Sequence, residues 1–178
     1  AALLKGFGSE MLDYVVDETV QIMGGMGFSS EMPADRAFRD SRINRIFEGT
    51  NEINRIWVAD TVVKRGHKKK IDIFAQAKEV MKELDNISSD DYKAKGYFED
   101  KGLFVKNFKK VVMLIMEAAS NKFGRKMSQE QEILSNLSDI VTHTYVAEST
   151  LLRVKKRESI DAAGDKDLYR DMLDVLMV

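Results

Sequence analysis

Apolar residues recur along this chain at intervals of three and four positions, which is the spacing of one face of an α-helix. The first such run covers about Leu3 to Met23, and the glycine-rich stretch that follows is expected to end the helix. The next segment, Phe28 to Arg36 around the chain's single proline, is predicted to be a loop. Because strand-like alternation is not sustained anywhere, we expect an all-α protein.

Two shorter helical patterns lie on either side of Gly49 and Thr50. The first is formed by Ile43, Ile46 and Phe47, and the second by Ile53, Ile56 and Trp57. Gly49 suits the left-handed position after a helix, and Thr50 is a good N-cap for the next one. Glu48 then falls at a helix C-terminus, where the helix dipole disfavours a negative charge. Its apolar neighbours predict partial desolvation, as a general base requires, and the alternative is an ordinary glutamate facing solvent.

The second of these helices is expected to end near Lys64, at the start of a basic run, KRGHKKK, that continues to Lys70. We interpret the run as a solvated linker that separates residues 1–66 from residues 67–178. Attraction to anionic lipid or to a phosphorylated ligand is the alternative.

Four more helices are predicted beyond this run. They cover about Phe74 to Ile87, Phe104 to Ala119, Ile133 to Val154, and a short stretch from Leu168 to Leu176. The segment Ser88 to Gly102 is expected to be a long connection. Together these helices could close as a small bundle.

Composition excludes several kinds of chemistry. The chain has 28 Lys and Arg against 29 Asp and Glu, so no overall field favours nucleic acid. The absence of cysteine excludes disulfides, thiolate metal sites and cysteine nucleophiles. His67 and His143 have no neighbours at ligand spacing, so no metal site is expected.

No apolar run reaches the roughly 18 residues of a membrane span, so we expect a soluble protein. The chain begins inside a helical pattern, without Met or signal-peptide features, and is expected to be a piece of a longer protein.

The stretch Gly24 to Gly27, GGMG, raises the question of a nucleotide site. A dinucleotide fingerprint needs G-x-G-x-x-G between a strand and a helix, and here a helix comes first, so we reject that interpretation. What remains is helix termination, or backbone that allows close approach of a helix or of a phosphate-bearing ligand.

QIMGGMGF at Gln21 to Phe28, followed by RIFEGTNEI at Arg45 to Ile53, closely resembles the C-terminal region of the acyl-CoA dehydrogenase family. The resemblance covers about Leu3 to Asp60. It is most like the very-long-chain branch, whose members carry an additional helical C-terminal domain. It therefore implies the second half of the family's C-terminal helical bundle in residues 1–66, and an additional small helical bundle in residues 67–178.

The resemblance assigns a role to Glu48, as the base that removes the α-proton of an acyl-CoA while FAD accepts the β-hydride. The product is a trans-2-enoyl-CoA, as in fatty-acid β-oxidation, and the backbone N–H of Glu48 helps to stabilise the enolate oxygen. Gly49 is implied to lie against the acyl-CoA. Contacts with FAD are implied for Thr50, Asn51 and Glu52 and, toward a flavin bound mainly by a partner subunit, for Gln21, Ile22, Met23, Gly24 and Gly25.

The same resemblance implies a homodimer or higher homo-oligomer that passes electrons to an electron-transfer flavoprotein. Its location would be the cytoplasm of a bacterium or the mitochondrial matrix of a eukaryote. For Arg39, Arg42 and Arg55, ion pairing within the protein is favoured over nucleotide contacts. Most of the flavin and substrate pocket lies outside these residues, so the chain alone is expected to be inactive.

Two alternatives remain open. One is an acyl-CoA oxidase, in which oxygen takes the electrons. The other is a helical module in which the residues after about Ile71 serve assembly or peripheral membrane attachment.

Overall fold

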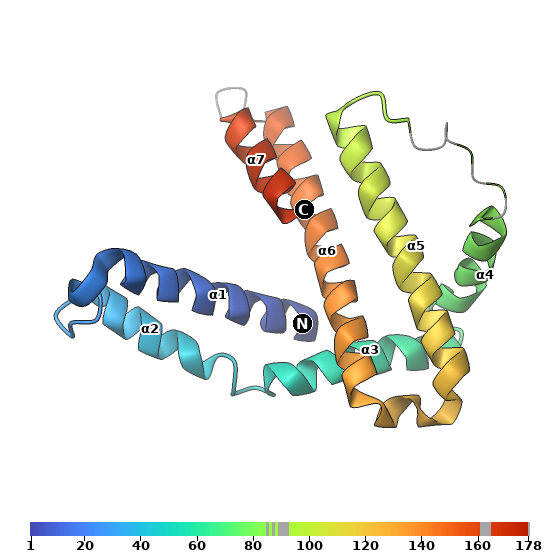
Figure 1. Cartoon of the computed structure of the whole chain (residues 1–178), viewed down its shortest axis with the longest axis horizontal. Helices are drawn as coiled ribbons and strands as arrows, with labels where there is room; N and C mark the ends of the chain where they lie inside the picture. The colour runs from blue at the N-terminus through green and yellow to red at the C-terminus, as the bar shows by residue number, and fades with distance from the viewer. Residues whose placement is uncertain (85, 87, 89–92, 161–164, 178) are drawn as a thin grey trace.

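The computed structural model describes residues 1–84, 86, 88, 93–160 and 165–177, and all regular structure in these ranges is helical (Figure 1). The α-helices are α1 (Ala2–Met23), α2 (Pro33–Ile43), α3 (Asn51–His67), α4 (Ile73–Leu84), α5 (Tyr97–Phe123), α6 (Gln131–Ile160) and α7 (Lys166–Leu176). Short 3-10 helices follow α1 at Gly24–Met26 and α5 at Gly124–Gln129. The all-α prediction is confirmed. None of the helices in the described ranges has the length and apolar character that a membrane crossing requires.

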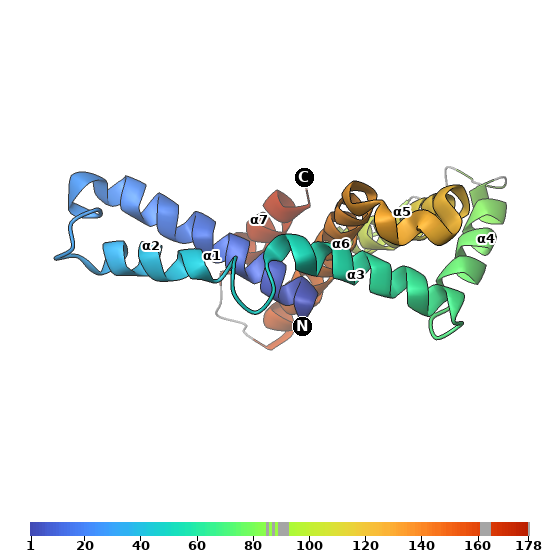
Figure 2. The same ribbon diagram turned by 90° about the horizontal axis from the view of Figure 1, so that it is seen from below.

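Helices α1 and α2 form an antiparallel arm that extends away from the other helices (Figures 1 and 2). α1 ends at Met23 and is followed by Gly24, which has a φ of 60°, as the glycine-rich stretch predicts. The predicted loop around Pro33 is wrong from that residue onward, because Pro33 begins α2. Proline is well suited to the first turn of a helix, where its missing N–H would have no intrahelical partner.

α2 ends at Ile43, four residues before the end that the apolar pattern predicts. The side chain of Asn44 donates to the carbonyl oxygens of Asp40 and Ser41, both at 3.2 Å, and so satisfies the last turn of the helix locally. Glu48 therefore does not lie at a helix C-terminus. It lies five residues beyond one, in an irregular connection.

The remaining helices pack around the long antiparallel pair α5 and α6. α3 crosses one end of this pair, α4 packs on α5, and α7 packs on the far part of α6 (Figure 1). The predicted helices at 104–119, 133–154 and 168–176 are confirmed, with longer bounds. α4 confirms the prediction from Phe74, whereas Ile87 and Ser89 to Asp91 lie outside the described residues. The predicted connection is shorter than expected, because α5 begins at Tyr97.

The basic run does not interrupt α3, which continues to His67. Gly66 is buried inside the helix, and a Cβ atom there would lie 2.7 Å from atoms of both Ile73 and Phe74. The glycine therefore allows α4 to approach α3 and does not break the helix.

Two clusters of buried apolar side chains lie along α6. The first combines Ala59 and Val63 of α3 with Met116, Met127, Leu134 and Leu137. The second combines Val105, Leu151, Val154, Leu173 and Met177. α6 thus forms part of both clusters, and α3 shares its core with the helices that follow residue 66.

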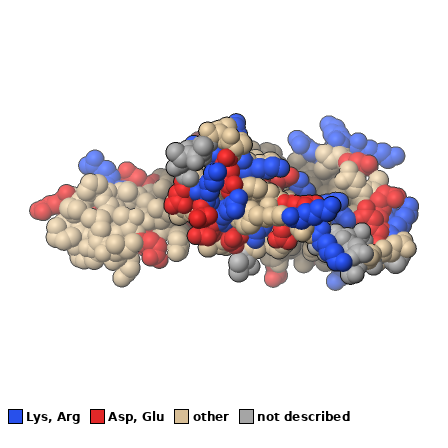
Figure 3. Space-filling model, turned by 90° about the horizontal axis from the view of Figure 1, so that it is seen from above, with Lys and Arg blue, Asp and Glu red and all other residues tan. Residues whose placement is uncertain are grey.

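The arm, in contrast, leaves many large apolar side chains exposed. Ile22 is 83% exposed and Phe28 is 71% exposed, and Leu12, Tyr14 and Val15 also face outward. In the view of Figure 3 the arm surface is largely uncharged, while Lys, Arg, Asp and Glu cover the other helices. The two helices of the arm therefore bury little of their own apolar surface.

Candidate functional site

The connection between α2 and α3 turns sharply at Glu48 and Gly49. Glu48 has a φ of 55° and Gly49 a φ of 82°, so two consecutive residues adopt the left-handed conformation. This conformation is unusual for a glutamate and ordinary for a glycine. The residues of this chain leave the Glu48 side chain exposed, so the expected partial desolvation is not found. Glu48 is presented to its surroundings at the tip of a tight turn.

The backbone next to Glu48 is held by two side chains. Lys5 Nζ and Asn54 Nδ2 each donate a hydrogen bond of 2.8 Å to the carbonyl oxygen of Gly49. The N–H of Asn51 donates to the carbonyl of Arg45 at 3.1 Å, which closes the turn. These bonds connect the turn to both α1 and α3.

Thr50 caps α3 as predicted. Its Oγ1 atom accepts a hydrogen bond of 3.3 Å from the N–H of Ile53. Glu52 lies exposed in the first turn of the helix. A hydrogen bond from its own backbone N–H and another from the Thr50 hydroxyl lower the pKa of Glu52, and Arg55 and Arg45 add to this effect. The start of α3 thus holds a stably ionised carboxylate.

The side chain of Asn51 is buried, with 1% exposure, and is directed at α1. It accepts a hydrogen bond from Lys5 Nζ at 2.8 Å. It donates to Ser9 Oγ at 2.9 Å, to Glu10 Oε1 at 3.2 Å and to the carbonyl of Gly6 at 3.4 Å. The implied FAD contact of Asn51 stays a prediction, and in this structure its side chain fastens the start of α3 to α1.

Arg55 joins three helices. It donates from Nη2 to Glu10 Oε2 on α1 at 2.8 Å, and from Nε to Asp139 Oδ1 on α6 at 2.6 Å. Partial burial disfavours its charged form, but the hydrogen bonds to Asp139 and Glu10 outweigh this effect and raise the pKa of Arg55. The ion-pair role favoured for Arg55 is the one observed.

The polar side chains of α1 that hold this turn were not singled out from the sequence. Lys5, Ser9 and Asp13 recur every four residues and so share one face of the helix. Lys5 and Ser9 bond to Asn51, and Asp13 pairs with Arg45 at 2.8 Å. This four-residue spacing of polar side chains was the signal that the sequence offered.

The other predicted cofactor residues lie at the opposite end of α1. Gln21, Ile22, Gly24 and Gly25 are exposed near the tip of the arm, and Met23 is half-buried beside them. A helix of 22 residues is about 33 Å long, so this group is well separated from Glu48. The structure therefore places the predicted site residues in two groups.

The histidines have separate local partners. His67 Nε2 lies 2.9 Å from Ser120 Oγ, and the ring of His143 meets that of Phe7 edge to face. Across the described residues, no three His, Asp or Glu side chains come together as metal ligands would.

Comparison with known proteins shows which family this chain resembles. Residues 1–63 and residues 107–177 match two family models, each described as the C-terminal domain of acyl-CoA dehydrogenase. A probable acyl-CoA dehydrogenase of Bacillus subtilis (strain 168) is 43% identical over 174 residues, which are 96% of this chain and 29% of that protein. The human mitochondrial very-long-chain specific acyl-CoA dehydrogenase is 59% identical over 59 residues, which are 33% of this chain and 9% of that protein.

The crystal structure of an acyl-CoA dehydrogenase complexed with FAD from Bacillus anthracis superimposes with a TM-score of 0.89. The two chains are 38% identical, and the match covers 99% of this chain and 29% of that one. The chain therefore belongs to the acyl-CoA dehydrogenase family, as part of its helical C-terminal region. It spans less than a third of the length of these relatives.

Proposed function

We propose that this chain supplies the catalytic base of an FAD-dependent acyl-CoA dehydrogenase. Glu48 would remove the α-proton of an acyl-CoA thioester, and its backbone N–H would help to stabilise the enolate oxygen that develops. The observation that carries the proposal is the left-handed turn at Glu48 and Gly49, which presents an exposed carboxylate from a backbone fixed by Lys5 and Asn54. Such fixed presentation is what a proton-transfer step requires.

The residues around the turn fit the proposed ligands. Gly49 is exposed and has no side chain, so it leaves room for an acyl-CoA beside the base. Glu52 is exposed at the start of α3, next to the capping residue Thr50, and this edge would contact FAD. When bound, FAD supplies the acceptor for the hydride that leaves the β-carbon. Since Glu48 is exposed here, exclusion of water from it would come from the substrate and from the rest of the full-length protein.

The second group of predicted cofactor residues supports a homodimer. Gln21 to Gly25 lie about one helix length from Glu48, so they suit contact with the flavin of a second subunit. We propose that this end of the arm reaches the ADP half of that FAD. The same reasoning applies to any higher assembly built from such dimers.

Long acyl chains, β-oxidation and transfer of electrons to an electron-transfer flavoprotein complete the proposal. The long-chain preference is supported by the 59% identity to the very-long-chain relative over 59 residues. Residues 1–66 would carry the chemistry, and residues 67–178 would form the additional helical unit. Peripheral membrane contact through the basic run stays an alternative role for that unit.

The experiment that tests the proposal is Glu48→Gln in the full-length protein. Turnover of a long-chain acyl-CoA with a dye acceptor should fall by roughly 10²- to 10⁴-fold, because the amide cannot accept the α-proton. The flavin absorbance of the purified variant should be unchanged. Glu132→Gln, which changes an exposed glutamate in the first turn of α6, serves as the matched control and should leave turnover intact.

Near-normal turnover by the Glu48→Gln enzyme would remove Glu48 from this role. Rates with oxygen and with electron-transfer flavoprotein as acceptor, compared in the same unmodified protein, separate a dehydrogenase from an oxidase.

A further inference from the structure

We propose that Asp139, on α6, is a positioning residue for the turn that carries Glu48. It would act through Arg55 and the polar side chains of α1. The expected effect on catalysis rests on the proposed function. The expected effect on the position of the turn rests on geometry alone. It gives residues 67–178 a specific part in the reaction.

A continuous series of hydrogen bonds leads from α6 to the turn. Asp139 accepts from Arg55 at 2.6 Å, and Arg55 donates to one oxygen of Glu10 at 2.8 Å. The other oxygen of Glu10 accepts from Asn51 at 3.2 Å. Asn51 in turn accepts from Lys5 at 2.8 Å.

The last step reaches the peptide next to the base, since Lys5 Nζ also donates to the carbonyl oxygen of Gly49 at 2.8 Å. Lys5 therefore bonds to Asn51 and Gly49 with the same ammonium group. Any displacement of Asn51 changes the position of that group, and with it the carbonyl that follows Glu48.

The centre of the series is constrained by burial. Asn51 is 1% exposed, so its amide has no water to replace a lost partner, and an unsatisfied buried amide is costly. Glu10 bonds to Asn51 through one oxygen and to Arg55 through the other. Without Asp139, Arg55 is free to move toward Glu10 and draw it away from Asn51.

Charge supports the same conclusion. Arg55 is held between the carboxylates of α1 and α6, so neither helix alone fixes the guanidinium. α3 also packs against α6 through Ala59, which is fully buried in the first apolar cluster, one turn beyond Arg55. α6 thus contributes both an apolar and an ionic contact to this part of α3.

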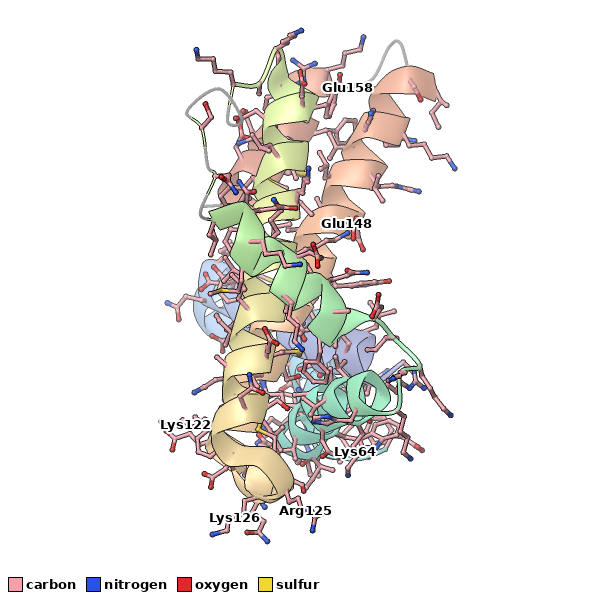
Figure 4. All side chains as sticks on the ribbon, turned by 90° about the vertical axis from the view of Figure 1, so that its right-hand side faces the viewer. Lys64, Lys122, Arg125, Lys126, Glu148 and Glu158 are labelled. Atoms are coloured by element: carbon pink, nitrogen blue, oxygen red, sulfur yellow. The ribbon has the colours of Figure 1, made fainter. Side chains whose placement is uncertain are left out.

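A matched control exists on the same helix. Glu148 of α6 forms an ion pair with Lys109 of α5, and its side chain is 36% exposed, against 42% for Asp139. Figure 4 shows Glu148 partway along α6, on the side of α3 away from Lys122, Arg125 and Lys126. Its ion pair joins α6 to α5 and involves none of the residues of the series.

The experiment compares Asp139→Asn with Glu148→Gln in the full-length protein. Amide hydrogen exchange of residues 48–53 should become faster in Asp139→Asn and stay unchanged in Glu148→Gln. The kcat of Asp139→Asn should fall by roughly twofold to thirtyfold, because substitutions of residues that act through others modulate coupling over about this range. KM should change by less than about twofold, and Asp139→Glu should recover most of the loss.

A double-mutant cycle tests the connection itself. Lys5→Met removes the link at Gly49, and its effect on kcat should combine with that of Asp139→Asn to less than the product of the two. Independent sites that do not touch give effects that multiply. A combined effect on kcat that is smaller than the product would therefore show that Lys5 and Asp139 act through the same series of hydrogen bonds.

Three results would overturn the proposal: exchange at residues 48–53 that is the same in Asp139→Asn and Glu148→Gln, a kcat unaffected by Asp139→Asn in an active enzyme, or effects that multiply in the cycle. If the unmodified full-length protein turns over no acyl-CoA, the proposed function fails. In that case hydrogen exchange still decides whether Asp139 holds the turn.

Discussion

At the scale of single residues, the absence of a side chain at Gly66 determines how two helices meet. Gly66 lies in the last turn of α3, where its missing Cβ admits the side chains of Ile73 and Phe74 at the start of α4. The ring of His67 packs beside Phe74, with the ring centroids 4.8 Å apart. α4 can approach α3 this closely because position 66 has no side chain.

Gly66→Ala should therefore destabilise the protein, by about 1–3 kcal/mol, because the new methyl group would overlap both neighbours. The control is Gly102→Ala, within α5, where an added Cβ has no heavy atom within 4 Å. That change should stabilise the helix by about 0.5–1 kcal/mol. Urea unfolding of the two full-length variants measures the difference, and equal stability of the two would contradict this account of Gly66.

At the scale of elements, α7 is held to α5 and α6 by a polar cluster. The hydroxyl of Tyr97 donates to the carbonyl of Arg170 and to Asp174 Oδ1, both at 3.0 Å. Arg170 forms a two-point ion pair with Glu158 at the end of α6, and Lys101 pairs with Asp174 at 2.7 Å. Each of the three helices therefore contributes charged or hydroxyl groups that bond to groups on another helix.

Tyr97→Phe tests this cluster through its pH dependence. Burial first, and then the hydrogen bond to Asp174, raise the pKa of Tyr97 to about 12 from an ordinary value of 10.0. A raised folded-state pKa stabilises the protein fully below pH 10, and this stabilisation is lost as the pH rises toward 12. The variant should be less stable than the parent protein by about 1 kcal/mol at pH 7.

Thermal unfolding at pH 9 and at pH 11 measures the stability difference between the parent protein and Tyr97→Phe. This difference should be smaller at pH 11 than at pH 9. Tyr145→Phe, at an exposed tyrosine of α6, is the control and should change the stability little. A difference for Tyr97→Phe that is independent of pH would contradict the proposed hydrogen bonding.

The helices themselves were predictable from the sequence, because the interval of apolar residues is a local property. The ends of α2 were not, since Pro33 suits a loop as well as a first helical turn, and Asn44 ends the helix through its own side chain. Gly66 is equally ambiguous, because only its contact with α4 shows whether it breaks a helix or packs closely. In the turn, the Thr50 cap is local and was predicted, whereas the partners of Asn51 lie more than 40 positions earlier.

At the scale of the whole molecule, the exposed apolar arm agrees with the small share of its relatives' length that this chain spans. The chain spans 29% of the Bacillus subtilis relative, and α1 and α2 carry apolar side chains that these residues leave uncovered. Contiguous apolar surface that is exposed on a folded protein marks a site where protein, membrane or ligand binds.

The 178-residue chain by itself should consequently show no turnover of palmitoyl-CoA with a dye acceptor, and weak FAD binding at most. It should bind the dye ANS through the arm, whereas the full-length protein should bind much less. Turnover by the isolated chain would show that its residues suffice for a pocket, contrary to this expectation.

The position of α6 has a consequence for the order in which the protein is made. Arg55 pairs with Asp139, which lies 84 positions later in the chain and is therefore synthesised after it. At a synthesis rate of about 5–20 residues per second, roughly 4–17 seconds pass before that partner has been added. During this interval the residues of α3 that pack on α6 in the folded protein do not yet have that partner. The segment with the proposed base is thus synthesised before the α6 residue that, in this proposal, positions it.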